Sequence, residues 1–489
     1  MQICRDRLCA SVVLQEDVTA AAWRPASDLA SGVYYWRVSS LQGVSVTDVV
    51  SKTWEFFVGR RSAPVDTSWG TTMDVNGDGF ADIAVGSPYS GSNAGRVWIY
   101  IGRSYGVQSA PVNTISGPGG MFGYFGSSVT AAGDVNGDGY VDVAIGAPGE
   151  LTDTGRVYVY LGSATGLVVP ASVVLTGPGG PMGSFGSSVA GAGDVNGDGY
   201  ADIVVGACDE TNLGAAYVYF GSADGTRSTA SNALIGPRDS GLFGSDVSGI
   251  GDVNGDRFED VVIGAYNERN VTGASYVYLG SPGGLASSPS VSIGGPDGPG
   301  GSFGVSVAGA GDVDADGYAD LVVGAPGAAV NFGRAYVYRG GAGGLGATAA
   351  SVLNGGVSGG SFGLSVAGAA DVDGDGYGEV IVGAPQTSSV GRVFVYAGSS
   401  SGLVTTAGRI LSRSTSTDYF GYSVSSAGDA NGDGRSDILI GAPEDNGSVG
   451  SAFVYWGAPS LGGLGAQQTI VDSMGVAGSL FGIVVSGSR

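Results

Sequence analysis

A nine-residue pattern that places oxygen-bearing side chains at fixed spacing recurs along the chain. In the copy at residues 194–202, such side chains stand at positions one, three, five and nine, and a glycine stands at position six. A hard cation such as Ca²⁺ binds about six to eight oxygens, and a tight loop supplies them with alternate side chains and a carbonyl at position seven. Glycine allows the positive φ that so short a loop needs. The pattern therefore predicts a calcium-binding loop.

The flanking residues indicate which elements the loop connects. Its first half matches an EF-hand loop, but position twelve carries no glutamate. Apolar residues follow instead, in a strand-like run of Ile203, Val204 and Val205. We therefore expect the loop to join two strands. The seven copies begin at Asp74, Asp134, Asp194, Asp252, Asp312, Asp371 and Asp429, with separations of 60, 60, 58, 60, 59 and 58 residues.

We assign one Ca²⁺ to each loop, up to seven in all, held by the side chains at positions one, three, five and nine and the carbonyl at position seven. In chain order the ligands are Asp74, Asn76, Asp78, Phe80 and Asp82; Asp134, Asn136, Asp138, Tyr140 and Asp142; Asp194, Asn196, Asp198, Tyr200 and Asp202; Asp252, Asn254, Asp256, Phe258 and Asp260; Asp312, Asp314, Asp316, Tyr318 and Asp320; Asp371, Asp373, Asp375, Tyr377 and Glu379; and Asp429, Asn431, Asp433, Arg435 and Asp437.

Two loops depart from the pattern. Arg257 replaces the position-six glycine of the fourth loop, where a side chain at positive φ costs on the order of 1 kcal/mol, so we expect the weakest site there. Glu379 replaces aspartate at position nine of the sixth loop, and its extra methylene requires a bidentate grip or a shifted ion. The fifth and sixth loops carry four carboxylates each, and we expect the tightest binding there.

The net charge has its source in these loops. Of 44 acidic residues, 23 occupy the four side-chain positions, which equals the formal charge of −23, and the remaining acids match the 21 bases in number. Acids in register at equivalent positions indicate cations that rigidify the fold. Loops of the extracellular type bind Ca²⁺ at roughly 10⁻⁴ to 10⁻³ M, which favours an exterior compartment, and Mg²⁺ is the poorer candidate because it retains its waters.

Composition excludes several other functions. There is no histidine, so histidine-based triads and zinc sites are absent, and no basic patch exists for nucleic acid because Lys52 is the only lysine. Cys4 and Cys9 are close enough to pair, while Cys208 is alone, a pattern that suits an oxidising compartment. No stretch approaches the length of a membrane span. No secretory signal is visible, and a fragment that lacks its true N-terminus would show the same absence.

The repeat of about 60 residues predicts the architecture. In the third unit, a small-residue strand at 185–193 precedes the loop, and strands at 201–207, 215–220 and 231–235 follow it. Four meandering strands per unit are typical of a propeller blade, and a parallel β-helix has much shorter turns. We predict an all-β, seven-bladed β-propeller over residues 66–489, after a small β segment at residues 1–60 and a short linker at 60–65.

Markers on both sides of each loop carry a family resemblance. Phe-Gly precedes the loop, as at Phe185-Gly186, and Gly-Ala-Pro follows it, as at 146–148, 324–326, 383–385 and 441–443. The chain resembles the FG-GAP repeats of integrin α-chain heads and of similar secreted bacterial proteins. The resemblance implies a calcium-binding propeller with loops on one face and partners docking on the other. The first unit departs with Trp69-Gly70, the third with Cys208 and the fourth with Tyr266.

The two ends of the chain raise separate questions. The strand patterns at 31–38 and 53–58 resemble the last strands of an immunoglobulin-like or fibronectin type III domain, and we favour a truncated module over a small appendage. At the other end, Phe481-Gly482 is an eighth marker. It begins either an unfinished eighth blade or a strand that closes the ring with the first blade, and we favour closure because it removes exposed edges.

These features favour a secreted or cell-surface binding or adhesion module, monomeric, with a protein or glycan partner on the face opposite the calcium loops. The candidate contacts are the variable segments at 87–94, 149–154, 209–213, 267–272 and 444–449, two of which contain glycosylation sequence patterns. The alternatives are a carbohydrate-binding propeller and an enzyme. An enzyme would use an irregular blade, and the fourth is the most irregular, with Arg257, Glu259, Tyr266 and Glu268. No Gly-x-Ser-x-Gly nucleophile elbow sits between a strand and a helix, so we expect no enzyme.

Overall fold

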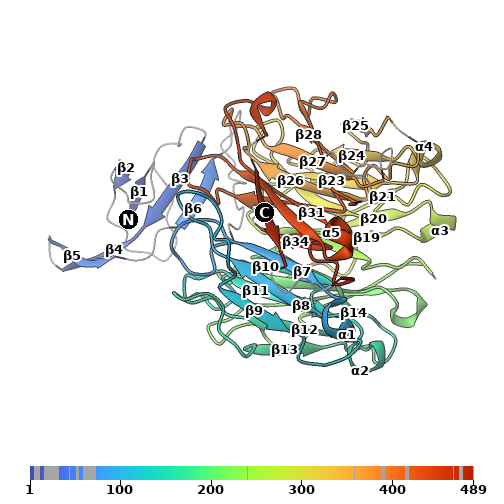
Figure 1. Ribbon diagram of the computed structural model, residues 1–489, viewed down its shortest axis with the longest axis horizontal. Coiled ribbons are helices and arrows are strands. Elements are labelled where there is room, and N and C mark those ends of the chain that lie inside the picture. Colours follow the sequence, from blue (N-terminus) through green and yellow to red (C-terminus); the bar gives the residue numbers. More distant parts are fainter. Residues whose placement is uncertain are drawn as a thin grey trace.

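The computed structural model describes residues 1–4, 11–15, 32–42, 45–50, 54–58, 73–238, 240–356, 358–386, 391–413, 418–465, 467–472 and 477–487. From residue 73 onward it forms seven four-stranded antiparallel sheets arranged around one axis (Figure 1). The first strand of each sheet contacts the first strands of its two neighbours, so these strands surround the axis. The predicted all-β, seven-bladed propeller is confirmed. The predicted domain boundary near residue 60 lies outside the described residues.

Six blades are meanders of consecutive strands. They are blade 2 with β10 (Ser128–Gly133), β11 (Asp142–Ala147), β12 (Arg156–Tyr160) and β13 (Val173–Thr176); blade 3 with β14 (Phe185–Gly193), β15 (Asp202–Ala207), β16 (Ala215–Tyr219) and β17 (Asn232–Ile235); blade 4 with β18 (Asp246–Gly251), β19 (Asp260–Ala265), β20 (Ala274–Tyr278) and β21 (Val291–Gly294); blade 5 with β22 (Val307–Gly311), β23 (Asp320–Ala325), β24 (Arg334–Tyr338) and β25 (Ser351–Asn354); blade 6 with β26 (Ser365–Ala370), β27 (Glu379–Ala384), β28 (Arg392–Tyr396) and β29 (Arg409–Ser412); and blade 7 with β30 (Ser423–Gly428), β31 (Asp437–Ala442), β32 (Ser451–Tyr455) and β33 (Gln467–Val471).

Blade 1 combines both ends of the propeller. Its order is β34 (Val484–Ser486), β7 (Ile83–Ser87), β8 (Arg96–Tyr100) and β9 (Asn113–Ser116), so the last strand of the chain takes the innermost place. Val485 pairs with Val85 in an antiparallel register, and Figure 1 shows red β34 beside blue β7. Of our two interpretations of the eighth marker, closure is therefore correct. The Trp69-Gly70 variant lies outside the described residues.

Burial follows the place of each strand in its blade. The second strands of all seven blades are buried along their whole length, whereas the outer strands β9, β13, β17, β21 and β29 bury only their third residue fully. A second strand lies between two strands and between two neighbouring blades, which explains its continuous Val, Ile and Ala sequence. Apolar packing between blades therefore forms the core.

The Phe-Gly and Gly-Ala-Pro markers meet where successive blades touch. Phe185 is fully buried and packs edge-on against Tyr219 of the same blade, with ring centroids 6.0 Å apart. A Cβ on Gly146 of blade 2 would lie 2.0 Å from the carbonyl oxygen of Gly186 in blade 3. Only glycine permits this approach, so the markers are packing features of the blade interface.

Alternating strand direction separates the connections into two faces. The acidic loops and the connections between third and fourth strands share one face, which we call the acidic-loop face. The opposite face carries the connections from second to third strands, with the one-turn helices α1 (Ser90–Asn93), α2 (Glu150–Asp153), η1 (Glu210–Asn212), α3 (Glu268–Val271), α4 (Ala328–Asn331) and α5 (Asp445–Ser448). Another single turn, η3 (Leu461–Gly463), lies on the acidic-loop face.

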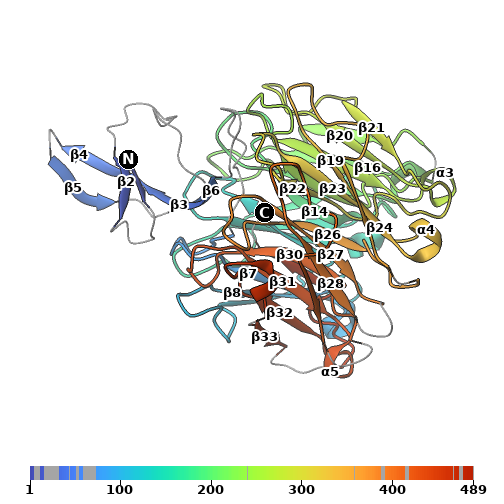
Figure 2. The same cartoon turned by 90° about the horizontal axis from the view of Figure 1, so that it is seen from above.

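The N-terminal residues form a separate small sheet with the order β2 (Val12–Gln15), β1 (Gln2–Cys4), β3 (Gly32–Arg37) and β6 (Trp54–Val58), beside a hairpin of β4 (Ser39–Gln42) and β5 (Ser45–Val50). The two predicted strands are thus confirmed and pair with each other. Cys4 is disulfide-bonded and Cys208 is free, and the expected partner Cys9 lies outside the described residues. In Figures 1 and 2 this sheet lies on the side away from α3 and α4.

The closing segment yields a stability prediction. Phe481 is fully buried and packs against Trp98 of blade 1, with centroids 4.9 Å apart. Replacing it with alanine removes this contact and leaves a cavity at the closure, so we expect Phe481→Ala to lower the free energy of unfolding by about 3–5 kcal/mol. Urea denaturation measures this change. Tyr105→Ala, at an aromatic residue of the same blade that is 78% exposed, is the control. Equal stability of the two variants would contradict closure by this segment.

Candidate metal centre

In blades 2 to 7 each acidic loop connects the first and second strands, as predicted, whereas in blade 1 it precedes the second strand, because the first strand, β34, comes from the other end of the chain. The position-nine acid is the first residue of the second strand in blades 2 to 7, and in blade 1 Asp82 directly precedes β7. The buried strand therefore anchors one end of the loop. A carboxylate at that point is carried into the interior with the strand, and Asp142 and Asp202, for example, are both fully buried.

The position-one carboxylate folds the loop around itself. In the second loop, Oδ1 of Asp134 accepts hydrogen bonds from the N–H groups of Gly137 and Asp138, at 2.7 and 3.0 Å. Its Oδ2 accepts one from Gly139 at 2.7 Å. Asp138 in turn accepts the N–H of Tyr140 at 2.9 Å. The bonds from the N–H groups of Asp138, Gly139 and Tyr140 have counterparts in the other six loops, so the position-one carboxylate holds each loop in a tight turn.

The position-nine carboxylate ties the loop to the rest of its blade. Oδ2 of Asp142 accepts the N–H of Val135 at 2.9 Å, and Oδ1 accepts the N–H of Gly162, beyond β12, at 2.8 Å. The same two bonds recur in every loop that has aspartate at this position. In the sixth loop, Glu379 Oε2 accepts the N–H of Val372 at 2.7 Å, and Oε1 has no partner among the described residues.

Hydrogen bonds join the seven loops into a closed cycle, which we call the loop ring. In each of these hydrogen bonds, the N–H of position eight in one loop donates to the carbonyl of position one in the preceding loop. The pairs are Val141 to Asp74, Ala201 to Asp134, Glu259 to Asp194, Ala319 to Asp252, Gly378 to Asp312, Ser436 to Asp371 and Ala81 to Asp429, at 2.9–3.3 Å. The last pair joins blade 1 to blade 7. Each loop therefore supports its neighbour directly, a feature that spacing alone did not reveal.

Burial places these acids where negative charge is unfavourable. It raises the pKa of Asp142, Asp202 and Asp260 to about 8, and nearby loop aspartates raise it further. Burial also raises the pKa of Asp74 to about 7, with Asp78 as the second cause. Backbone N–H groups act in the opposite direction but do not outweigh burial. A divalent cation within the loop would supply the missing positive charge.

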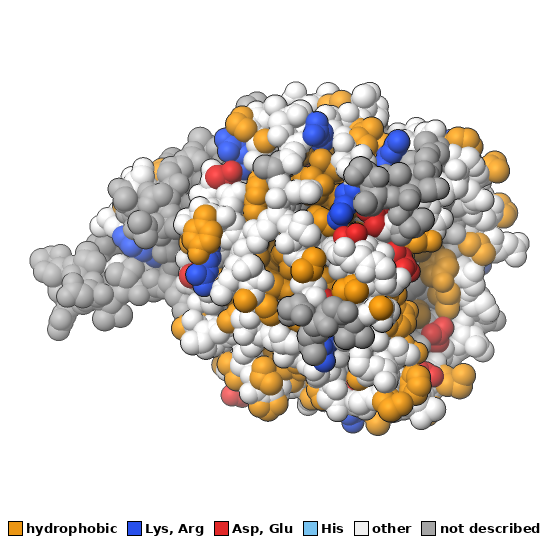
Figure 3. Space-filling model, viewed as in Figure 1, with side chains coloured by type: hydrophobic (Ala, Val, Ile, Leu, Met, Phe, Trp, Pro, Cys, Tyr) orange, Lys and Arg blue, Asp and Glu red, His pale blue; other side chains and the backbone are white. Residues whose placement is uncertain are grey.

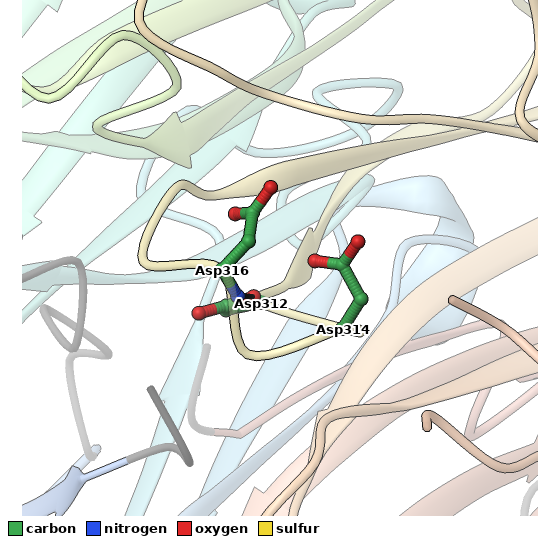
Figure 4. Close-up of side chains that lie close together, drawn as sticks. All are labelled: Asp312, Asp314 and Asp316. Atoms are coloured by element: carbon green, nitrogen blue, oxygen red, sulfur yellow. Dashed lines mark hydrogen bonds between the residues drawn. The ribbon is translucent and has the colours of Figure 1, made fainter. Parts of the chain in front are cut away.

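Carboxylate oxygens gather most closely in the fifth and sixth loops. One oxygen from each of Asp312, Asp314 and Asp316 lie within 4.8 Å of one another, and Figure 4 shows the three side chains rising from a single loop. Asp371, Asp373 and Glu379 form a second such group. Within the described part of the chain, Oδ1 of Asp314 and of Asp373 are buried without a hydrogen-bond partner. Unpartnered buried oxygens in close groups fit a hard cation.

Backbone geometry bears on two loop positions. Arg257, at position six of the fourth loop, has φ of 77°, beside 90° for Gly199 at the same position of the third loop. The expected strain is therefore present. Ala315, at position four of the fifth loop, has φ of 57°, where the third loop has Gly197 at 74°. This second substitution was not among the predicted departures, although it is visible when the seven copies are aligned.

A set of acids on the opposite face was also missed. Glu150 is buried, and its carboxylate accepts the hydroxyl of Tyr158 at 2.7 Å. Glu210 accepts from Tyr217 at 2.5 Å, and Glu268 accepts from Tyr276 at 2.6 Å. The signal was visible as a glutamate at the same distance after Gly-Ala in three units. Because Glu268 belongs to this repeated set, it no longer marks an irregular site in the fourth blade.

Comparison with known proteins now identifies the family. The model of the FG-GAP repeat matches residues 67–100, 125–160, 185–219, 243–279, 303–338, 362–396 and 420–466, together more than half of the chain. The chain belongs to the FG-GAP repeat family. The predicted resemblance is thereby confirmed for the propeller, and the immunoglobulin-like assignment of the N-terminal segment stays a prediction.

Integrin α chains are among the similar proteins. Integrin alpha-7 of Mus musculus is 38% identical over 137 residues, which are 27% of this chain and 11% of that protein. Integrin alpha-IIb of Mus musculus is 42% identical over 143 residues, 27% of this chain and 14% of that protein. Integrin alpha-4 of Xenopus laevis is 35% identical over 136 residues, which are 27% of this chain and 13% of that protein. The matched part is thus a small fraction of each relative. Among the described residues, no helix is long and apolar enough to cross a membrane.

The strained fourth loop allows a gain-of-stability prediction. Arg257→Gly relieves a side chain at positive φ, and we expect it to raise the free energy of unfolding in Ca²⁺ by up to about 1 kcal/mol, with part of the gain offset by a more flexible unfolded chain. Gly199→Arg, the reverse change in the third loop, should lower stability. The space beside Gly199 is open, so conformation alone is tested. Urea titrations of both variants decide, and changes of the same sign would refute the explanation.

The raised carboxylate pKa values predict a dependence on pH. Asp142, Asp202 and Asp260 have native pKa values of about 8 against an ordinary value of 3.8, so between these values the native state binds more protons than the unfolded chain. In EDTA the melting temperature should therefore fall as pH rises from about 4 to about 8. Added Ca²⁺ should raise the melting temperature, and most at the upper end, where protons compete least. Melts that are independent of both pH and Ca²⁺ would contradict this account.

Proposed function

We propose that this protein is a calcium-stabilised, secreted or cell-surface adhesion or ligand-binding module that holds up to one Ca²⁺ in each acidic loop. The observation that carries the calcium assignment is the close grouping of carboxylates in the fifth and sixth loops, with buried, unpartnered oxygens at Asp314, Asp373 and Glu379 among the described residues. Side chains at positions one, three, five and nine, with the position-seven carbonyl, would hold each ion. The ions would neutralise the acids and stiffen the ring. Membership of the FG-GAP family and similarity to integrin α chains support the binding role.

We place the partner on the face opposite the acidic loops. The position-one carbonyls, the position-nine carboxylates and the third-to-fourth connections are engaged with one another on the acidic-loop face. The opposite face instead carries second-to-third connections that are seven or eight residues long in every blade but differ in composition. Variable loops on a rigid scaffold are the usual location of recognition.

Exposed apolar side chains favour a protein partner. Phe122 and Met182 are 55% and 70% exposed and stand in the connections that lead into blades 2 and 3. Leu151, in α2 between them, is 50% exposed. Their turns are joined, since the N–H of Met182 donates to the carbonyl of Thr152 at 3.2 Å. Apolar groups gathered on adjacent turns fit a protein surface better than a sugar. In the view of Figure 3, charged side chains are scattered among apolar and uncharged ones.

Two other functions have weaker support. A glycan-binding propeller stays the alternative within binding proteins. Catalysis in the fourth blade has lost one of its four indications, because Glu268 accepts the hydroxyl of Tyr276 in the same way that Glu150 accepts that of Tyr158. The protein is therefore proposed as a non-enzymatic, monomeric binding module, and its N-terminal segment as part of an immunoglobulin-like or fibronectin type III domain.

A binding experiment with matched variants tests the proposed face. We expect the protein to bind at least one member of a panel of extracellular-matrix proteins in millimolar Ca²⁺ and to lose binding in EDTA. Phe122→Asp and Met182→Asp should each weaken binding roughly tenfold or more, which corresponds to about 1.4 kcal/mol, because they charge the apolar surface. Tyr105→Asp is the control, since Tyr105 is 78% exposed in the connection between β8 and β9, on the acidic-loop face.

Biolayer interferometry on the panel, with a glycan array in parallel, provides the measurement. Binding that Tyr105→Asp weakens and the other two variants do not would place the partner on the wrong face. Binding to glycans alone would favour the carbohydrate alternative.

A further inference from the structure

The sixth loop differs from the others in how its position-nine carboxylate is held. In the other loops both oxygens of the aspartate accept backbone N–H groups, as in Asp320, at 3.0 Å from Val313 and 2.9 Å from Gly340. Glu379 keeps the first of these contacts through Oε2. Its longer side chain leaves Oε1 without a hydrogen-bond partner among the described residues, although Glu379 is fully buried. This oxygen is therefore free for another ligand.

Glu379 belongs to a group of acids. One oxygen each from Glu379, Asp371 and Asp373 lie within 4.8 Å of one another. Oδ1 of Asp373 is also buried without a partner in the described part of the structure. Two unpartnered oxygens in one buried cluster are costly, because each has lost water without gaining a donor and the charges repel one another. A divalent cation would satisfy both and remove the repulsion.

Neighbouring arginines offset the extra charge of the four-carboxylate loops. In the fifth loop, Arg339 pairs with Asp314 at 2.9 Å. In the sixth loop, the guanidinium of Arg435 lies beside Gly374, since a Cβ built on this glycine would be 3.4 Å from Nε. At the equivalent Gly137 of the second loop, the neighbouring group is the aromatic ring of Tyr200. Net charge therefore does not distinguish the fifth loop from the sixth. The number of available oxygens does, because Asp320 is held at both oxygens and Glu379 at only one.

We propose that the sixth loop binds the divalent cation most tightly and is the last to release it, with Glu379 supplying a ligand oxygen that the corresponding aspartates hold against the backbone. This inference rests on the proposed calcium binding. The loop ring extends its effect, since Ser436 of the seventh loop donates to the carbonyl of Asp371 and Gly378 of the sixth donates to that of Asp312. An ion retained in the sixth loop keeps both neighbouring contacts ordered while other loops empty.

The test counts bound calcium on the full chain while free Ca²⁺ is lowered with chelator buffers, by mass spectrometry of the metal after gel filtration. The wild type should retain about one ion per chain at a concentration that empties the other loops. Glu379→Asp should release that ion at roughly tenfold higher free Ca²⁺, while the total bound at saturation stays the same. This variant restores the residue that the other six loops use, so it is expected to fold, and circular dichroism in Ca²⁺ verifies this.

A second variant tests the opposing charge. Arg435→Tyr introduces the residue type found at position seven in most other loops and removes the cation beside the sixth loop, so the last ion should be released at lower free Ca²⁺ than in the wild type. Release of all ions in one step by the wild type, or a last ion that Glu379→Asp leaves unaffected, would overturn the inference. Absence of any bound calcium at millimolar concentration would instead refute the proposed calcium binding itself.

Discussion

The hydrogen bond from position eight of one acidic loop to the position-one carbonyl of the preceding loop constrains the whole propeller. Because it recurs around the full circle, from Val141 and Asp74 to Ala81 and Asp429, no loop can change its conformation independently. The same loops carry buried carboxylates whose pKa is raised, so unfavourable electrostatics lie within the structure that joins the blades. A bound cation would therefore neutralise these acids within the same structure that holds the blades together.

Closure of the propeller also depends on a contact between parts of the chain that are far apart in sequence. The chain leaves its first blade without an inner strand, and β34 fills that place from the opposite end. Phe481 then packs on Trp98 as Phe185 packs on Tyr217, the residue at the same position of blade 3, so the last marker completes the first blade. An open propeller would expose the edge of β7 and break the loop ring between blades 7 and 1. The strand pairing at the axis and the ring on the acidic-loop face thus depend on each other.

Much of this architecture was predictable, because repetition turns a weak local pattern into a strong one. The blade number, the position of the loops between first and second strands, and the strain at Arg257 all followed from aligning copies of one unit. What could not be predicted involves contacts between units. The loop ring uses backbone groups, which leave no trace in side-chain type. The second hydrogen bond to Asp142 comes from Gly162, twenty residues away across β12. The loss of the corresponding bond at Glu379 is visible only in the atomic positions of the carboxylate oxygens.

These contacts also explain why seven similar loops need not be equivalent. A solenoid-like repeat permits each copy to vary as long as its neighbours tolerate the change. In the fourth loop, the variation affects the backbone at Arg257, which a cation cannot relieve. In the sixth, it affects an unpartnered oxygen at Glu379, which a bound cation would satisfy directly. Because the ring couples neighbours, stability lost in one loop can be supplied by the next. Under the proposed calcium binding, differences among the loops would set the order in which cations leave, while the fold stays common to all.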